Sequence, residues 1–121
     1  MEKKPEINQL FQAIDRRDTE AFLSFLSDDV FFRFGNAEPV QGKEAVRETI
    51  RGFFGSIQAL RHTVVESWDQ QDVMTCHGTV TYTRHDDSTL TVPFANVIKL
   101  DKGLFNRYYI FADVSDLYRN N

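Results

Sequence analysis

The feature that most constrains the fold is the change of hydrophobic period at Gln58. Before it, apolar side chains recur every three or four positions, which predicts helices over residues 5–16 and Lys43–Gly55. After it, four long apolar segments separated by turn clusters predict strands. These strands are expected at Leu60–Trp68, Val73–Arg84, Leu90–Leu100 and Leu104–Ala112. Helices followed by an antiparallel meander predict an α+β fold, in one domain spanning residues 1–121.

Shorter elements are expected between the first and last helices. A second helix, capped by Asp18 or Thr19, is predicted to end at residues 27–29. Val30–Phe34 then reads as a short strand, and Gly35–Gly42 as a loop.

Two of the predicted strands are about eleven residues long, roughly twice the usual mean. Strands of this length must bend to pack on helices, and bends use glycine or bulges. Gly78 and Pro93 stand in mid-strand, where each is otherwise unfavourable. We therefore expect a strongly curved sheet around the three N-terminal helices, which gives a cone-shaped fold.

Composition excludes several classes of protein. The net charge of −4 and the pI near 5.3 argue against a nucleic-acid or polybasic membrane surface. The single cysteine, Cys76, excludes an intramolecular disulfide and fits a reducing compartment. No apolar stretch is long enough for a signal peptide or a membrane span, so a cytoplasmic protein is expected.

Pairing apolar positions across the predicted hairpins suggests a pocket on the inner sheet face. A three-residue turn at residues 101–103 sets Asn96 opposite Tyr108, and a similar turn after His85 sets Gly78 opposite Asn96. His62 then faces Gly78 or Val80. The result is a row of three polar side chains around the gap left by Gly78. A two-residue turn would break this row. The candidate ligand-binding residues beside this row are Phe34, Val80, Tyr82, Phe94, Ile98, Asn106 and Trp68.

Each polar candidate has a structural and a functional interpretation. His62 is either a hydrogen-bonded core histidine or a general acid/base, since histidine side chains suit proton transfer at physiological pH. Asn96 needs partners on an apolar face, so it bonds either within the core or to a ligand. Tyr108 either packs its ring or stabilises an oxyanion. Trp68 at a strand end either covers the core or contacts a ligand.

The spacing of potential metal-ligating and phosphate-binding residues does not indicate a metal or cofactor site. The sequence contains no His-x-His, Cys-x-x-Cys or His-Glu-x-x-His arrangement, and no phosphate-binding glycine loop. We therefore expect no metal and no cofactor.

The order of helices and strands, together with several local stretches, resembles the nuclear transport factor 2-like superfamily and, within it, the SnoaL-like family. The stretches that carry the resemblance are Asp18–Phe22, Leu26–Val30, Leu60–Val64, Val80–Arg84, Val92–Val97, and Gly103–Leu104 followed by Tyr109–Asp113. They cover nearly the whole chain and are specific for the fold, whereas the superfamily mixes enzymes with binding proteins.

The catalytic residues of related enzymes are mostly missing here. Leu10 and Phe34 stand where ketosteroid isomerases place a tyrosine and an aspartate, and Ile110 stands where limonene epoxide hydrolases place an acid. Scytalone dehydratase and polyketide cyclases use histidines with acids, and His62 is a candidate for such a histidine. The sequence suggests no inward acid beside His62, because Glu66 lies about 13 Å along the strand.

Three functions remain open. The first is a pocket protein that binds a small apolar or aromatic, polyketide-like molecule. The second is a cyclase, isomerase or dehydratase in which His62 moves a proton and Asn96 or Tyr108 stabilises an oxyanion. The third is a dimeric accessory module with a filled cone. The resemblance implies a homodimer through the outer sheet face, whose side chains would be Thr75, Thr79, Thr81, Val97, Arg107, Tyr109 and Phe111.

Overall fold

The computed structural model describes residues 6–118, which form three helices and six strands. The helices are α1 (Ile7–Asp15), α2 (Thr19–Leu23) and α3 (Lys43–Gly55). The strands are β1 (Leu26–Phe34), β2 (Val40–Gln41), β3 (Ala59–Gln70), β4 (Val73–Thr83), β5 (Thr89–Asp101) and β6 (Leu104–Ala112).

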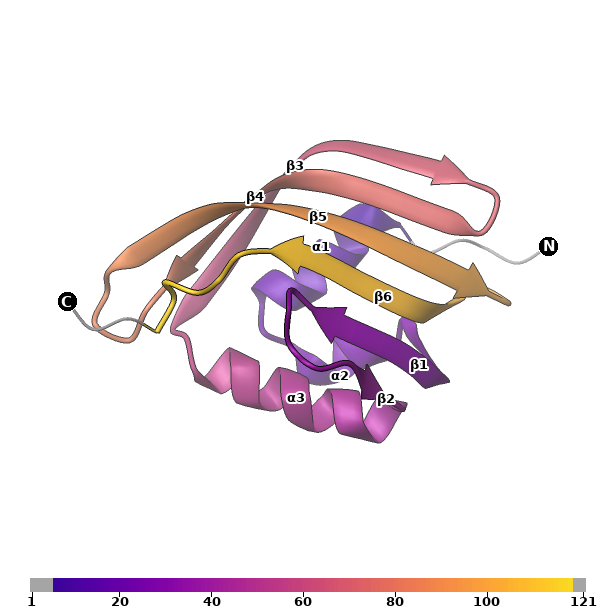
Figure 1. The fold of residues 1–121 in the computed structure, drawn as a ribbon, viewed down its shortest axis with the longest axis horizontal. Helices are drawn as coiled ribbons and strands as arrows, with labels where there is room; N and C mark the ends of the chain where they lie inside the picture. The colour runs from indigo at the N-terminus through magenta and orange to yellow at the C-terminus, as the bar shows by residue number, and fades with distance from the viewer. Residues whose placement is uncertain (1–5, 119–121) are drawn as a thin grey trace.

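The helices cover the inner face of a curved sheet, as the sequence predicts. The strands within residues 6–118 form one sheet in the order β2-β1-β6-β5-β4-β3, and only the β1–β6 pair is parallel. In Figure 1 the sheet lies in front of α1 and α2, and its long strands bend over them, while α3 runs along the lower edge. The helices, short connections and meander give the α+β cone expected from the sequence.

The apolar period accounts for α1 and α3, and a side-chain cap accounts for the start of α2. α1 buries Leu10 and Phe11 on one side, and α3 buries Val46 and Ile50, as the 3.6-residue period requires. The Asp18 side chain accepts the backbone N–H of Ala21 at 3.1 Å, which caps α2.

The first strand is longer than predicted. It begins at Leu26 instead of Val30, so the prediction that residues 27–29 end a helix is wrong. Leu26 is fully buried and pairs with Phe105 of β6, and this distant partner outweighs the local turn signal of Ser27–Asp29. Val40 and the next residue also pair with β1, which makes part of the predicted loop a short strand.

The β5–β6 turn also differs from the prediction. Lys102 and Gly103 have φ angles of 54° and 80°, which is typical of a two-residue type I′ turn instead of a three-residue turn. Taken alone, a two-residue turn would exchange the inward-facing and outward-facing side chains of β6. An irregularity in the β5–β6 pairing leaves Asn106 unpaired as an extra residue, and this bulge returns Tyr108 to the inner face.

These turns shift the predicted registers by two residues, which leaves Asn96 and Tyr108 on the inner face, whereas Leu104 is exposed and Phe105 takes the buried position. The single row of His62, Gly78, Asn96 and Tyr108 is therefore wrong. The observed pairs are His62 with Val80, Gly78 with Phe94, Asn96 with Ile110, and Ile98 with Tyr108.

The bend in the sheet occurs where Gly78 meets β3. The pairing of β3 with β4 is irregular between Val64 and Glu66, which leaves Val65 as a bulge residue opposite Gly78 and its neighbour. A Cβ atom added at Gly78 would lie 1.8 Å from the Thr63 carbonyl oxygen. Only glycine permits this close approach of two backbones.

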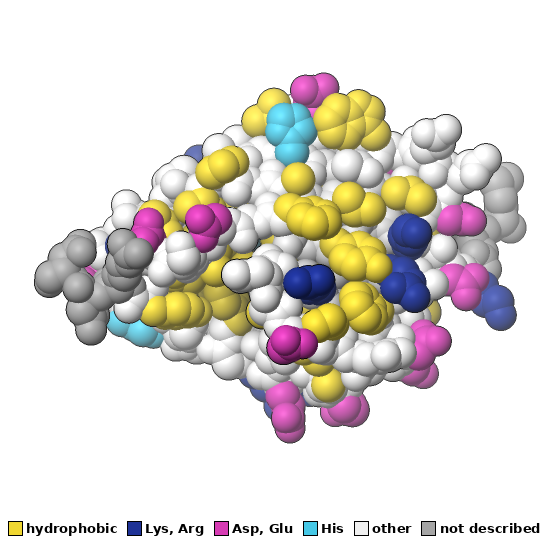
Figure 2. Space-filling model, viewed as in Figure 1, with side chains coloured by type: hydrophobic (Ala, Val, Ile, Leu, Met, Phe, Trp, Pro, Cys, Tyr) yellow, Lys and Arg dark blue, Asp and Glu magenta, His cyan; other side chains and the backbone are white. Residues whose placement is uncertain are grey.

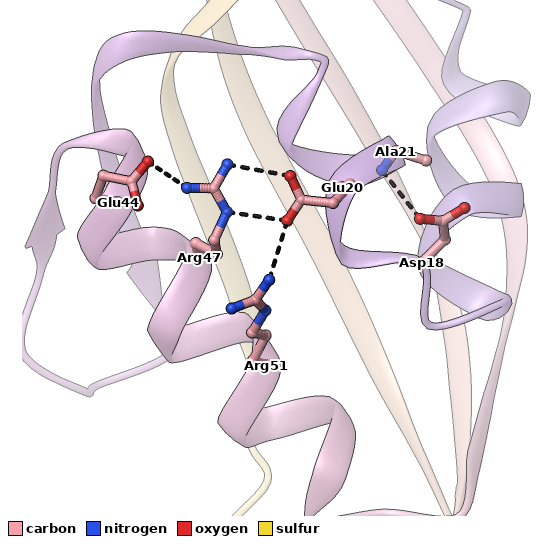
Figure 3. Close-up of polar contacts among 6 residues, drawn as sticks. All are labelled: Asp18, Glu20, Ala21, Glu44, Arg47 and Arg51. Carbon is pink, nitrogen blue, oxygen red and sulfur yellow. Dashed lines mark hydrogen bonds and ion pairs between the residues drawn. The ribbon is translucent and has the colours of Figure 1, made fainter.

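An exposed ion-pair cluster joins α2 to α3 (Figure 3). The Arg47 guanidinium donates two hydrogen bonds to the Glu20 carboxylate, at 2.9 and 3.1 Å, and also pairs with Glu44. Arg51 contacts the same Glu20 carboxylate at 3.5 Å. The hydrogen bond from Arg47 holds the pKa of Glu20 below its usual value. The cluster fixes the relative position of two helices that form the wall of the cone.

The segment after β6 folds back across the β4–β5 hairpin. The Arg84 guanidinium donates to the carbonyl oxygens of Leu117 at 2.8 Å and Asp116 at 3.0 Å. Leu117 is buried, and the Tyr118 hydroxyl lies 2.7 Å from the Ser56 hydroxyl at the end of α3. This segment therefore covers one end of the cone.

The outer face of the sheet carries exposed apolar side chains. Figure 2 shows hydrophobic side chains gathered at the centre of this face, interspersed with basic ones. Phe111 is 56% exposed, and Arg107 lies over the Phe31 ring at 5.2 Å. Among residues 6–118, no helix has the length and apolar character needed to cross a bilayer.

Candidate functional site

A cavity lies between the inner face of the sheet and the helices. It has a volume of about 40 Å³, which is room for about three water molecules. Phenylalanine rings form much of its wall, together with a few polar side chains from the sheet. The lining phenylalanines are Phe11, Phe22, Phe32, Phe34, Phe53, Phe54 and Phe94.

The most specific feature of the cavity is a hydrogen-bonded pair of Asp15 and His62. Asp15 Oδ1 lies 2.6 Å from His62 Nδ1, and Asp15 Oδ2 accepts the backbone N–H of His62 at 2.9 Å. The Phe11 ring lies 4.5 Å from the imidazole between centroids, and the Phe94 ring meets it edge to face at 5.0 Å. The carboxylate and the two rings together fix the orientation of the imidazole.

The hydrogen bond to Asp15 determines which nitrogen of His62 can react. A carboxylate only accepts hydrogen bonds, so the proton of a neutral imidazole is held on Nδ1. The lone pair is then on Nε2, for which no hydrogen bond occurs within residues 6–118. His62 lines the cavity and only 10% of its side chain is exposed. This arrangement suits a general base oriented by a carboxylate.

Two further polar groups in the cavity lack partners. The Asn96 Oδ1 atom and the Tyr108 hydroxyl are buried and have no hydrogen-bond partner within the described part of the chain. Burial raises the pKa of Tyr108 far above its ordinary value, so the phenol remains a hydrogen-bond donor. Burying such groups without partners costs about 1–3 kcal/mol each. A ligand oxygen or amide in the cavity would provide the missing bonds.

The structure brings most of the predicted site residues together. Those that line the cavity are Phe34, His62, Val80, Tyr82, Phe94, Asn96 and Tyr108. The Tyr82 phenol is also buried, and burial raises its pKa well above the ordinary range.

Three predicted residues lie outside this cavity. Ile98 is fully buried beside Tyr108 in the core. Asn106 is displaced by the β6 bulge, and its buried Oδ1 has no partner among residues 6–118. Trp68 is 50% exposed and stacks on His77, with 5.7 Å between ring centroids. Trp68 pairs with Thr75, which places it on the outer face.

The expectation that no inward acid lies beside His62 is wrong, because Asp15 supplies it from α1. The two residues are 47 positions apart, so spacing along the strand gave no indication of the pair. One local signal was available. Asp15 follows Phe11 by four positions, on the buried face of α1, and ends the helix where the helix dipole disfavours a carboxylate. A residue that violates a local preference in this way is often functional.

Metal-ligating side chains do not gather in this cavity. Across residues 6–118, no group of three or more histidine, cysteine or acidic side chains is arranged to hold an ion. Cys76 is buried beneath the site, opposite Asn96, and burial raises the pKa of its thiol to about 11.

Replacing Tyr108 by phenylalanine is expected to stabilise the protein by about 1 kcal/mol, because it removes a buried hydroxyl without a partner. Urea unfolding measures this gain. Tyr109→Phe is the matched control, since the Tyr109 hydroxyl accepts a hydrogen bond from Arg107 at 3.1 Å. A loss of stability in Tyr108→Phe would show that the hydroxyl is satisfied within the fold.

Comparisons with solved structures agree with the fold described above. An NTF2-like protein of unknown function from Burkholderia pseudomallei superimposes with a TM-score of 0.82 at 19% identity, over 92% of this chain and 90% of that one. A putative polyketide cyclase from Pseudomonas putida gives 0.75 at 18% identity, over 92% and 91%. An epoxide hydrolase of the LEH-like type from M. tuberculosis gives 0.78 at 13% identity, over 93% and 83%.

At these identities the structural neighbours establish the fold and leave the activity open. A search of curated protein sequences finds no match. The SnoaL-like domain, in contrast, matches residues 7–108. Since this match spans most of the chain, the protein belongs to the SnoaL-like domain family.

Proposed function

We propose that the protein is a cofactor-independent enzyme that moves a proton on a small, largely apolar carbonyl compound. The observation that carries this proposal is the Asp15–His62 pair in a cavity that also contains the unpartnered Tyr108 hydroxyl and Asn96 Oδ1. An apolar wall with a few convergent polar groups is typical of a small-molecule site. The class of reaction includes isomerisation, cyclisation and dehydration.

In the proposed mechanism, His62 Nε2 takes a proton from the carbon next to the substrate carbonyl. The C–H electron pair forms the enolate double bond, and the carbonyl oxygen becomes the oxyanion. The Tyr108 hydroxyl donates a hydrogen bond to this oxygen, and the Asn96 side chain bonds a second polar group of the substrate. Asp15 stabilises the imidazolium that forms. In a substrate with a β,γ double bond, return of the proton from the imidazolium to the γ carbon completes an isomerisation. In a substrate with a second carbonyl, the enolate carbon attacks that carbonyl, and the imidazolium protonates the new alkoxide to complete a cyclisation.

Two other functions compete with this proposal. A small-molecule binding protein would use the same cavity without proton transfer. The small volume of about 40 Å³ favours a dimeric accessory module with a filled cone. A cone arranged only to be filled would gain stability from apolar residues in place of Asp15, His62, Asn96 and Tyr108. The protein therefore keeps these four polar side chains at a cost in stability, and this cost is our reason for preferring the enzyme.

Hydrogen–deuterium exchange tests the proposal without knowledge of the natural substrate. Cyclopentanone and cyclohexanone are incubated with the protein in deuterium oxide, and the loss of their α-proton signals is followed by ¹H NMR. Exchange well above that in buffer containing free imidazole supports the enzyme. Chemical-shift changes at the Ile50 and Ile110 methyl groups without exchange identify a binding protein instead, and the absence of both identifies a filled module.

We also propose that two copies of the chain pair through their outer sheet faces. Phe111 and Trp68, both at least half exposed, support this proposal, because contiguous exposed apolar surface marks interaction sites. Phe111→Lys is expected to convert the dimer to a monomer in sedimentation equilibrium. Tyr118→Lys is the control, since Tyr118 is similarly exposed, at 58%, but lies outside the sheet. A monomeric wild type, or an equal effect of both variants, would contradict the proposal.

A further inference from the structure

Two phenylalanine rings line both the inner cavity and a groove on the surface. Phe34 at the end of β1 and Phe53 in the last turn of α3 line the cavity and also line the groove. Their ring centroids are 5.2 Å apart, and both side chains are partly buried. A molecule that passes from the groove toward His62 along this route must move at least one of these rings.

The two rings differ in how firmly they are held. Phe34 stands on a strand paired with β6, where it lies opposite Ile110. The next residue, Gly35, donates its N–H to the Ile110 carbonyl oxygen at 2.7 Å, which fixes the end of this strand. Phe53, in contrast, belongs to the last turn of a helix, and such turns open at low cost.

The sequence of this last turn weakens it further. Gly52 and Gly55 flank Phe53 and Phe54, and a Cβ atom added at either glycine would meet nothing within 4 Å. Neither glycine has a positive φ angle. Packing and backbone conformation therefore give no reason for glycine at these positions. Each glycine in a helix lowers its stability relative to alanine.

Side chains from other elements hold the end of this turn closed. Arg17 donates to the Phe54 carbonyl oxygen at 3.4 Å, and His85 Nε2 lies 2.9 Å from the Gly55 carbonyl oxygen. The Phe53 ring itself meets Tyr82 edge to face, at 5.9 Å between centroids. Ser56 Oγ also donates to the Phe53 carbonyl oxygen at 2.7 Å. These contacts lie at one end of the helix, so they can break without unfolding the sheet.

We propose that Phe34 and Phe53 form a partition that sets the size of molecules able to reach His62, and that Phe53 moves aside when the glycine-flanked turn of α3 opens. The identity of the ligand as a carbonyl compound rests on the proposed function, whereas the partition does not. A cavity of about 40 Å³ with such a partition selects flat, narrow molecules over bulky ones.

Binding of two ketones of different shape tests the partition. Cyclopentanone is the flat probe and 2-adamantanone the bulky one, and methyl NMR signals of Ile14, Ile50 and Ile110 in the cavity wall report binding. We expect the wild type to bind only cyclopentanone and Phe53→Ala to bind both. Phe31→Ala is the control, because Phe31 lies on the same strand as Phe34 and does not line the cavity. Continued exclusion of 2-adamantanone by Phe53→Ala, or its equal admission by Phe31→Ala, would overturn the proposal.

The glycines provide a second test that leaves every cavity residue unchanged. Gly52→Ala and Gly55→Ala are each expected to slow both binding and release of cyclopentanone about two- to fivefold, measured by NMR line shapes. The dissociation constant should stay the same, since free and bound states are both closed. Unchanged rates of binding and release would contradict the proposal that Phe53 moves aside when this turn of α3 opens.

The outcomes separate this inference from the proposed function. Binding of cyclopentanone without α-proton exchange refutes the enzyme and leaves the partition standing. α-Proton exchange of cyclopentanone, together with continued exclusion of 2-adamantanone from Phe53→Ala, refutes the partition and leaves the enzyme standing. If neither ketone binds to the wild type or to Phe53→Ala, the partition is refuted.

Discussion

Replacing His62 by glutamine is expected to lower the rate of ketone α-proton exchange by about 10²–10⁴-fold, the usual contribution of a positioned general base. Glutamine keeps a polar side chain of similar length but provides no nitrogen lone pair that can take the proton. The ¹H NMR assay in deuterium oxide measures this loss directly. Binding of cyclopentanone should persist, because the apolar wall of the cavity remains.

The partner of His62 supplies an independent test of the same mechanism. Asp15→Asn presents an amide to Nδ1 where the carboxylate stood. The amide can donate its own proton, which favours the wrong imidazole tautomer and removes the charge that stabilises the imidazolium. We therefore expect a loss of exchange comparable with that of His62→Gln, and no additional loss in the double variant, since the two residues act as a unit.

The outer face offers a matched control for this pair. His77 Nε2 lies 3.5 Å from a Glu66 carboxylate oxygen, so His77→Gln removes a second histidine beside a carboxylate that lies away from the cavity. We expect full exchange activity in this variant. Equal losses in His62→Gln and His77→Gln would contradict the assignment of His62 as the base.

Replacing Gly78 by alanine is expected to destabilise the protein by about 3 kcal/mol, the upper part of the range for overpacked sites. The new Cβ would lie 1.8 Å from the Thr63 carbonyl oxygen and 3.0 Å from Val64 Cα, and both are backbone atoms that cannot rotate away. The β3 and β4 strands must therefore separate at the bulge. Urea unfolding followed by circular dichroism measures the change.

Gly52→Ala is the control for this substitution. A Cβ atom there meets nothing within 4 Å, so alanine should raise stability by about 0.5–1 kcal/mol. Stability changes of opposite sign in Gly78→Ala and Gly52→Ala would show that close backbone approach, and not loss of glycine as such, determines the effect. Wild-type stability in Gly78→Ala would mean that the bulge relaxes freely. Because Thr63 is next to His62, we also expect Gly78→Ala to reduce exchange.

The sequence predicted the elements well where local pattern and tertiary packing agree. The bounds of α3 and β6 match the predictions, because glycine and other turn residues flank both elements. Errors occur where distant contacts decide the outcome. β1 extends back to Leu26 through its parallel pairing with β6, and the strand registers depend on turn types that differ by a single residue.

The site was predictable only in part, for a related reason. Alternation along the strands places His62, Asn96 and Tyr108 on the inner face, and a register error of two residues leaves each face unchanged. Asp15 depends on how α1 lies across β3, which no strand pattern encodes. The size of the cavity depends on the rotamers of its phenylalanine rings, and the sequence does not specify these.

The position of Trp68 determines what optical spectroscopy can measure in this protein. It is the chain's single tryptophan, half exposed and stacked on His77 on the face opposite the cavity. Its fluorescence is therefore expected to change when copies of the chain pair and to change little when a ketone enters the cavity. The emission spectrum thus gives a direct signal for assembly that is separate from the signal for ligand binding.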